Sequence, residues 1–144
     1  MTLQAAHILL VEDDPGDVML TREAFKQTEM VSEISVAADG IEALEFLRGQ
    51  GDHPAAQRPD LILLDLNMPR MNGLDFLSAL KGDSELKRIP VVVFSTSTAD
   101  ADVVASYDRY ANSYISKPVH YHEYSDVVKS VEEFWLRIAK LPQD

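Results

Sequence analysis

Four short, mostly apolar runs in this chain each end at a chemically reactive side chain. Short runs of this kind between polar segments are typical of buried strands in a parallel sheet. In an open parallel sheet, ligands bind beyond the carboxyl ends of the strands, so the reactive side chains are predicted to meet at one edge. The runs and the residues that follow them are 8–11 before Glu12 and Asp13, 61–64 before Asp65, 91–94 before Ser95, and 114–116 before Lys117.

Amphipathic stretches alternate with these runs, and that alternation predicts a doubly wound α/β fold with five strands and five helices. Strands are predicted at 7–11, 33–38, 60–65, 91–94 and 113–116. Helices are predicted after Asp14, after Asp39, and at 74–81, 98–110 and 121–138, with a surface loop over 49–59. Right-handed crossovers between parallel strands then fix most of the topology.

Capping signals mark three of the predicted helix starts. Asp14 followed by Pro15 is predicted to begin the first helix, since aspartate is a good N-cap and proline suits the first helical position. Asp39 with Glu42 three residues later is predicted to begin the second helix. Thr98 is predicted to cap the fourth helix through its hydroxyl.

The charge of the chain narrows its possible functions. Its 144 residues, of which 46% are apolar, suit one domain over 1–144 with no separate output domain. The formal net charge of −11 argues against binding to nucleic-acid phosphates. No apolar run approaches the ~18 residues of a membrane span, and no secretory signal begins the chain, so a cytoplasmic protein with no membrane partner is expected.

Glu12, Asp13 and Asp65 form the first candidate site. An acid at a strand end often does no more than cap the next helix, as Asp14 and Asp39 are predicted to do. Glu12 and Asp13 differ because consecutive acids cannot both serve one cap. If the three carboxylates meet, their mutual repulsion requires a compensating cation. Mg²⁺, which prefers oxygen ligands, is the predicted ion.

Lys117 and Ser95 add the groups that could contact a phosphoryl group at this edge. A lysine is more often simply solvated, and Ser95 opens a run of hydroxyl side chains that can serve as helix caps. Beside the acids, however, the Lys117 ammonium would neutralise a phosphoryl oxygen. A cis bond between Lys117 and Pro118 is hypothesised to aim the lysine at the site. These residue types together predict a metal-assisted phosphoryl acceptor site.

The combination of motifs resembles the receiver domain of two-component response regulators. This resemblance implies a flavodoxin-like parallel sheet with the strand order 2-1-3-4-5 and five helices. The matching stretches are ILLVEDD at 8–14, LLDLNMPRMNG at 63–73, IPVVVFS at 89–95 and YISKP at 114–118.

Carried over by position, the resemblance implies a role for each reactive residue. Asp65 would accept a phosphoryl group from a histidine of a sensor kinase, and Lys117 would pair with that group. Asp13 would bind Mg²⁺ directly, Glu12 would bind it through water, and Asn67 would bind it through its main-chain carbonyl.

The resemblance also implies a switch and an assembly. Ser95 would move to hydrogen-bond the phosphoryl group, and Tyr114, otherwise an ordinary core residue, would rotate inward after it. The long segment 49–59 and the aromatic end of the chain are similar to small stand-alone regulators that partner bacterial phytochrome kinases. Members of that subgroup tend to dimerise, so Trp135, which alone would read as core, becomes a candidate homodimer contact. The chain would signal through protein contacts and would act on no substrate beyond its own phosphoryl group.

Two other functions share parts of this pattern. A small-molecule phosphatase of the haloacid-dehalogenase type also uses an aspartate nucleophile, Mg²⁺ and a lysine, but it carries Asp-x-Asp after its first strand and a cap insertion. Here the candidate nucleophile follows the third strand, and Asn67 takes the place of the second acid. A nucleotide-binding or purely structural flavodoxin-like module is the other alternative, yet no glycine-rich phosphate loop follows the first strand.

Overall fold

The computed structural model describes residues 6–27, 31–50 and 58–142, and strands alternate with helices throughout. The strands are β1 (Ala6–Val11), β2 (Val31–Ala37), β3 (Leu61–Leu64), β4 (Val91–Ser95) and β5 (Ser113–Ser116). The helices are α1 (Pro15–Lys26), α2 (Gly40–Arg48), α3 (Gly73–Lys81), α4 (Asp100–Asp108) and α5 (Tyr121–Val131), which continues as the π-helix η1 (Glu132–Ile138).

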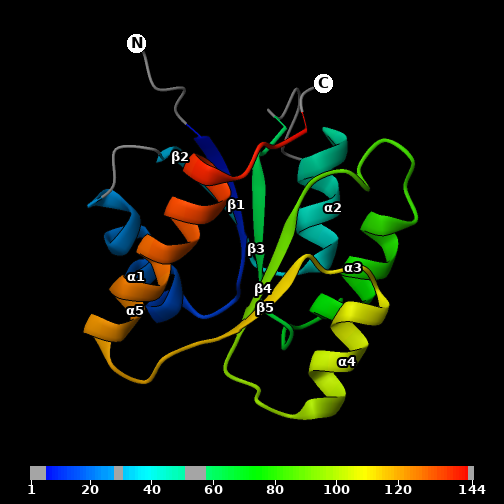
Figure 1. Cartoon of the computed structure of the whole chain (residues 1–144). Helices are drawn as coiled ribbons and strands as arrows, with labels where there is room; N and C mark the ends of the chain where they lie inside the picture. The colour runs from blue at the N-terminus through cyan, green and yellow to red at the C-terminus, as the bar shows by residue number, and fades with distance from the viewer. Residues whose placement is uncertain (1–5, 28–30, 51–57, 143–144) are drawn as a thin grey trace.

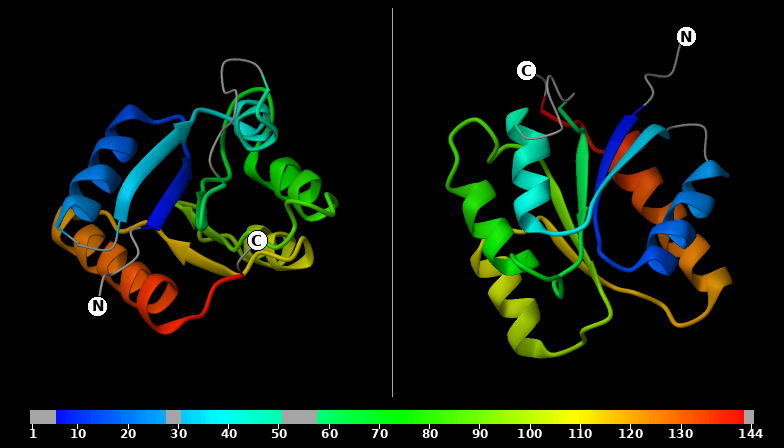
Figure 2. Two further views of the ribbon diagram at one scale, coloured as in Figure 1. Left: turned by 90° about the horizontal axis from the view of Figure 1, so that it is seen from above. Right: turned by 180° about the vertical axis from the view of Figure 1, so that it is seen from behind.

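The five strands form one parallel sheet in the order β2-β1-β3-β4-β5, so the predicted fold and strand order are confirmed. Figure 1 shows α1 and α5 on one face of the sheet and α2, α3 and α4 on the other, and Figure 2 shows the same layers from above and from behind. Within the described ranges, no helix is long and apolar enough to cross a membrane.

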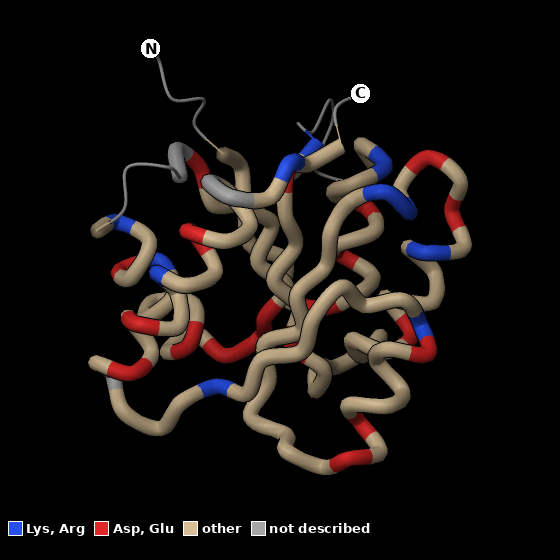
Figure 3. Tube along the Cα trace, in the orientation of Figure 1, with Lys and Arg blue, Asp and Glu red and all other residues tan. Residues whose placement is uncertain are grey.

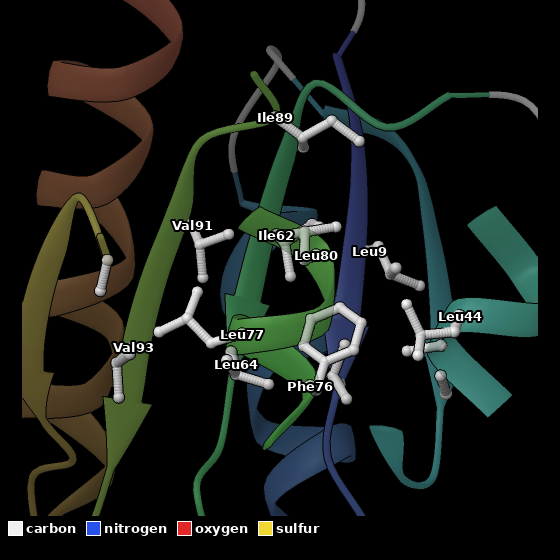
Figure 4. Close-up of a cluster of buried hydrophobic side chains, with 14 of the residues drawn as sticks. Leu9, Leu44, Ile62, Leu64, Phe76, Leu77, Leu80, Ile89, Val91 and Val93 are labelled. Carbon is white, nitrogen blue, oxygen red and sulfur yellow. The ribbon is translucent and has the colours of Figure 1, made fainter. Parts of the chain in front are cut away.

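Two cores lie against the two faces of the sheet. Every residue of β1 and β3 is buried, as expected for central strands covered by helices on both sides. Successive side chains of a strand point to opposite faces, so Leu9 and Ile62 join one core while Ile8 and Leu61 join the other. Figure 4 shows the first core, in which Phe76 of α3 packs against the sheet. This packing on both sides fixes the position of the strand ends.

Two of the predicted caps are confirmed. The Asp14 carboxylate accepts hydrogen bonds from the backbone N–H groups of Gly16 (2.8 Å) and Asp17 (3.3 Å), and Pro15 is the first residue of α1. The Asp39 carboxylate accepts from the Glu42 N–H at 2.9 Å. Both caps satisfy N–H groups that have no partner within their own helix.

The predicted cap at Thr98 is wrong. Ala99 occupies the N-cap of α4 and offers no side-chain hydrogen bond. The Ser97 hydroxyl serves the start of this helix instead, because it accepts from the Ala99 N–H at 3.3 Å and donates to the Asp102 carboxylate at 2.5 Å. Any hydroxyl in the run Ser95–Ser97 or at Thr98 fits the same local signal, so the sequence pattern alone selected the wrong one.

The last helix also differs from the prediction. A single α-helix was expected over 121–138, whereas the α-helical part ends at Val131 and η1 follows with wider π turns. The predicted loop over 49–59 includes residues 51–57, which lie outside the described residues. The other boundaries agree with the predictions to within about two residues, a common margin at element ends.

Candidate functional site

The carboxyl ends of β1 and β3 hold three carboxylates beside one another. β1 pairs with β3 in parallel, with Val11 opposite Leu64, so the residues that follow these two strands become neighbours. The Asp65 N–H donates to the Val11 carbonyl at 3.0 Å, which extends the strand pairing to the first acid beyond β3. The Glu12 N–H likewise donates to the Ala37 carbonyl of β2 at 2.9 Å. The backbone pairing of the strands therefore fixes the positions of both acids.

Glu12, Asp13 and Asp65 have the character of a cation site. One carboxylate oxygen from each lies within 4.8 Å of the others, with Glu12 and Asp65 buried and Asp13 exposed. Oε2 of Glu12 is buried and has no hydrogen-bond partner. A buried carboxylate oxygen without a partner is costly, and a hard cation such as Mg²⁺ would supply the missing interaction. The residues present therefore fit the predicted ion.

Lys117 lies beside these acids, as predicted. Its side chain is only 5% exposed, and its Nζ lies 2.5 Å from Oε1 of Glu12, 3.0 Å from Oδ2 of Asp17 and 3.8 Å from Oδ1 of Asp65. Its backbone N–H donates to the Ser95 carbonyl at 2.7 Å, which continues the pairing of β5 with β4. The Lys117–Pro118 bond is trans, so the hypothesis of a cis bond is wrong. The strand pairing, with no unusual peptide bond, carries the lysine to the site.

The crowded carboxylates shift the protonation of the site. Burial deprives the Glu12 carboxylate of water and, with the neighbouring Asp65 and Asp17, raises the pKa of Glu12 to about 9. Burial also opposes the charged form of Lys117, but the acids Glu12, Asp65 and Asp17 outweigh it and raise the pKa of the ammonium above its ordinary value. Lys117 is therefore cationic at neutral pH. A further cation beside Glu12 would lower the pKa of that carboxyl, because opposite charge favours its ionised form.

Ser95 and Tyr114 meet through the loop that follows β4. Ser95 is fully buried, and its Oγ accepts a hydrogen bond from the Ser97 N–H at 3.2 Å. The Tyr114 hydroxyl donates to the Ser97 carbonyl at 2.8 Å, and its half-buried ring packs against the core. The two predicted switch residues are therefore connected to the same residue, Ser97. Their predicted movement stays a prediction.

The loop that carries Asn67 is anchored by a glycine. The Gly73 N–H donates to the Leu66 carbonyl at 2.9 Å, and a Cβ at position 73 would lie 2.2 Å from the Asp65 carbonyl oxygen. Only glycine permits so close an approach of the two backbones. Asn67 is exposed on this loop, two residues beyond Asp65, and its role as a main-chain ligand stays a prediction.

Sequence reasoning missed one residue of the site. Asp17, the third residue of α1, contacts Lys117 although the two lie 100 positions apart in the chain. Burial opposes ionisation of Asp17, but contacts with Glu12 and Lys117 outweigh it and lower the pKa of Asp17. The only local signal was its position in the first turn of the helix that follows the acid pair.

Trp135, the predicted homodimer contact, lies in η1 and is not part of this site. Its predicted role concerns the assembly of two chains.

The distribution of charged residues along the sheet agrees with a cation site at the carboxyl ends of the strands. Figure 3 shows acidic positions where the central strands finish, and several basic positions near the opposite end of the sheet, where further acidic positions also lie. The acid-rich end is the one that carries Glu12, Asp13 and Asp65. With the chain at a formal net charge of −11, this end would attract cations.

Comparison of the sequence with known proteins gives a family match and a close relative. The family model described as "Response regulator receiver domain" matches residues 8–129. The response regulator Rcp1 of Synechocystis sp. is 42% identical over 135 residues, which cover 94% of this chain and 92% of that protein.

Two solved structures have nearly the same shape. The phosphorylated cyanobacterial phytochrome response regulator RcpA aligns with a TM-score of 0.92 at 45% identity, over 96% of this chain and 99% of that one. The Mn²⁺-bound form of Rcp1 aligns with a TM-score of 0.90 at 40% identity, again over 96% and 99% of the two chains.

Proposed function

Since this chain belongs to the response regulator receiver family of two-component signalling proteins, we propose that Asp65 is its phosphoacceptor and Mg²⁺ its metal ion. The observation that carries the proposal is the position of Asp65. Its buried carboxylate ends a central strand, two other acids approach it within 4.8 Å, and the Lys117 ammonium lies 3.8 Å away. Glu12, Asp13 and the Asn67 carbonyl would hold the ion.

The transfer requires little covalent work from the protein. An oxygen of the Asp65 carboxylate forms a bond to phosphorus as the bond between phosphorus and a histidine nitrogen of the kinase breaks, and the bonding electron pair returns to that imidazole. A bound Mg²⁺ would neutralise charge on the oxygens of the transferred group. Lys117 would pair with one of these oxygens, and the Ser95 hydroxyl would donate to another. The fixed strand ends supply the orientation.

The phosphorylated protein would then signal through contacts with other proteins. The phosphoryl group adds negative charge and new acceptor oxygens, which would draw Ser95 toward the site and bias the position of Tyr114 through their shared partner Ser97. The partner kinase is proposed to be a phytochrome, because the chain is similar to the cyanobacterial phytochrome response regulator RcpA and to a response regulator in red light signalling of R. palustris. No nucleic-acid partner is proposed for a chain of this charge. The small-molecule phosphatase alternative is not favoured by the family match.

Phosphoryl incorporation is expected to require magnesium. The protein is incubated with acetyl phosphate, with Mg²⁺ or with a chelator, and its intact mass is measured. One phosphoryl increment is expected with Mg²⁺ and none with the chelator, because the three acids repel an anionic donor unless a cation intervenes. Equal incorporation in both samples would exclude a requirement for Mg²⁺. The absence of any mass increment would exclude the phosphoacceptor role of Asp65.

We further infer a homodimer contact around Trp135. Phe134 is 51% exposed, and its ring packs edge-on against that of Trp135 with centroids 5.4 Å apart. Phe134 is exposed beside the half-buried Trp135, and aromatic side chains are common anchors of protein interfaces. The variant Phe134→Ser is expected to shift sedimentation equilibrium toward monomer, while Tyr110→Ser, which removes an exposed ring far along the chain from this pair, should leave it unchanged. An unchanged dimer in Phe134→Ser, or a monomeric wild type, would contradict the contact.

A further inference from the structure

The Lys117 ammonium is bound by acids that would compete for it with a phosphoryl group on Asp65. It carries three N–H donors. Hydrogen bonds to Glu12 and Asp17 use two of them, whereas Asp65 at 3.8 Å is beyond hydrogen-bond distance. A phosphoryl group on Asp65 would need a donor from this lysine. The third N–H donor is not used by these two bonds, but the ammonium lies 3.8 Å from Asp65, so it would have to shift away from its contacts with Glu12 and Asp17 to approach the reacting group.

Asp17 can be released from Lys117 at a lower cost than Glu12. The side chain of Asp17 is 27% exposed, so water can solvate its carboxylate once the lysine moves away. The side chain of Glu12 is only 2% exposed and already has one oxygen without a partner. Losing Lys117 would leave the buried Glu12 carboxyl group without its remaining hydrogen-bond partner, which is unfavourable.

The backbone of Asp17 is tied to α5. The Thr21 hydroxyl donates to the Asp17 carbonyl at 2.9 Å and lies 2.7 Å from the hydroxyl of Tyr124, a buried residue of α5. The first turn of α1 is thus held by its own helix and by α5, and the Asp17 carboxylate projects from a fixed support. A carboxylate fixed in this way holds the ammonium on the α1 side of the site.

We propose that Asp17 is a positioning residue that retains Lys117 in the unphosphorylated protein and releases it to the phosphoryl group on Asp65. This role rests on the proposed phosphoacceptor function. It means that Asp17, an acid outside the cation site, regulates the phosphorylation of Asp65. Loss of the Asp17 charge frees the lysine in advance. Phosphorylation then becomes faster, because one interaction of the starting state no longer has to be broken.

The test compares initial rates of phosphoryl incorporation from acetyl phosphate at saturating Mg²⁺, followed by intact mass. Asp17→Asn is expected to react about two- to fivefold faster than the wild type, the range that a partly exposed ion pair supports. Asp17→Glu, which restores the charge, should return toward the wild-type rate. Glu23→Gln removes the same charge from the same helix, where Glu23 pairs with Lys26, and should match the wild type.

A double-mutant cycle separates release of the lysine from a general charge effect. In a Lys117→Gln background, Asp17→Asn should no longer change the rate, since the two residues act through one contact. An equal acceleration with and without Lys117, or an Asp17→Asn rate at or below that of the wild type, overturns the proposal while leaving the phosphoacceptor role intact. Absence of incorporation in the wild type overturns both.

Discussion

Asparagine at position 65 is expected to abolish phosphoryl incorporation entirely. The amide has nearly the shape of the carboxylate but lacks the anionic oxygen that would attack phosphorus, and it weakens the cation site formed with Glu12 and Asp13. The fold should survive, because the change removes a negative charge from a crowded group of acids. Intact mass after incubation with acetyl phosphate and Mg²⁺ provides the measurement, with circular dichroism to verify folding.

Asp60→Asn is the matched control for this variant. Asp60 precedes β3 at the opposite end of the strand, and its Oδ2 accepts a hydrogen bond from the His7 N–H at 2.8 Å, which an amide oxygen can also accept. The control should incorporate phosphoryl as the wild type does. Full incorporation in Asp65→Asn would mean that another acid of the cluster is the acceptor.

Alanine at position 73 is expected to cost about 3 kcal/mol of unfolding free energy or more. The added Cβ would lie 2.2 Å from the Asp65 carbonyl oxygen and 2.8 Å from the Leu66 Cα. Both are backbone atoms, so the clash can be relieved only by moving the loop that carries the phosphoacceptor. Urea unfolding followed by circular dichroism measures the loss. Phosphorylation of the folded fraction should fall as well, because the displaced backbone belongs to Asp65 itself.

Gly40→Ala supplies the comparison. A Cβ at position 40 would also be too close to its neighbour, at 2.6 Å, but the neighbour is the flexible side chain of Met71. That side chain can move aside, so a cost of at most about 1 kcal/mol is expected. Equal losses for the two alanine variants would show that the proximity to the Asp65 backbone carries no special penalty.

The sequence was most informative where one short stretch contained the whole signal. The apolar runs predicted the strands, and Asp14 with Pro15 and Asp39 with Glu42 predicted two helix starts, because each pattern depends on residues a few positions apart. The meeting of the strand ends followed from a general property of parallel sheets, and it placed Lys117 correctly beside the acids.

The remaining features depend on contacts between distant parts of the chain. The involvement of Asp17 in the site requires Lys117 to arrive from the end of β5, and no local pattern near α1 indicates that contact. Thr98 failed as a cap because four neighbouring hydroxyls present the same signal and tertiary packing chose Ser97. The preference of Lys117 for Glu12 and Asp17 over Asp65 is likewise a matter of tertiary geometry.

The π-helix η1 determines where the chain can vary in length. A π turn closes with i→i+5 hydrogen bonds and so contains one residue more than an α turn. Deleting one residue within 132–138 would let the segment return to α-helical pairing, while Tyr124 and Val128 keep their places in the core. A deletion within α5 itself would rotate all later side chains by about 100° around the helix axis. Single-residue insertions and deletions among related chains should therefore be tolerated best at the end of the last helix.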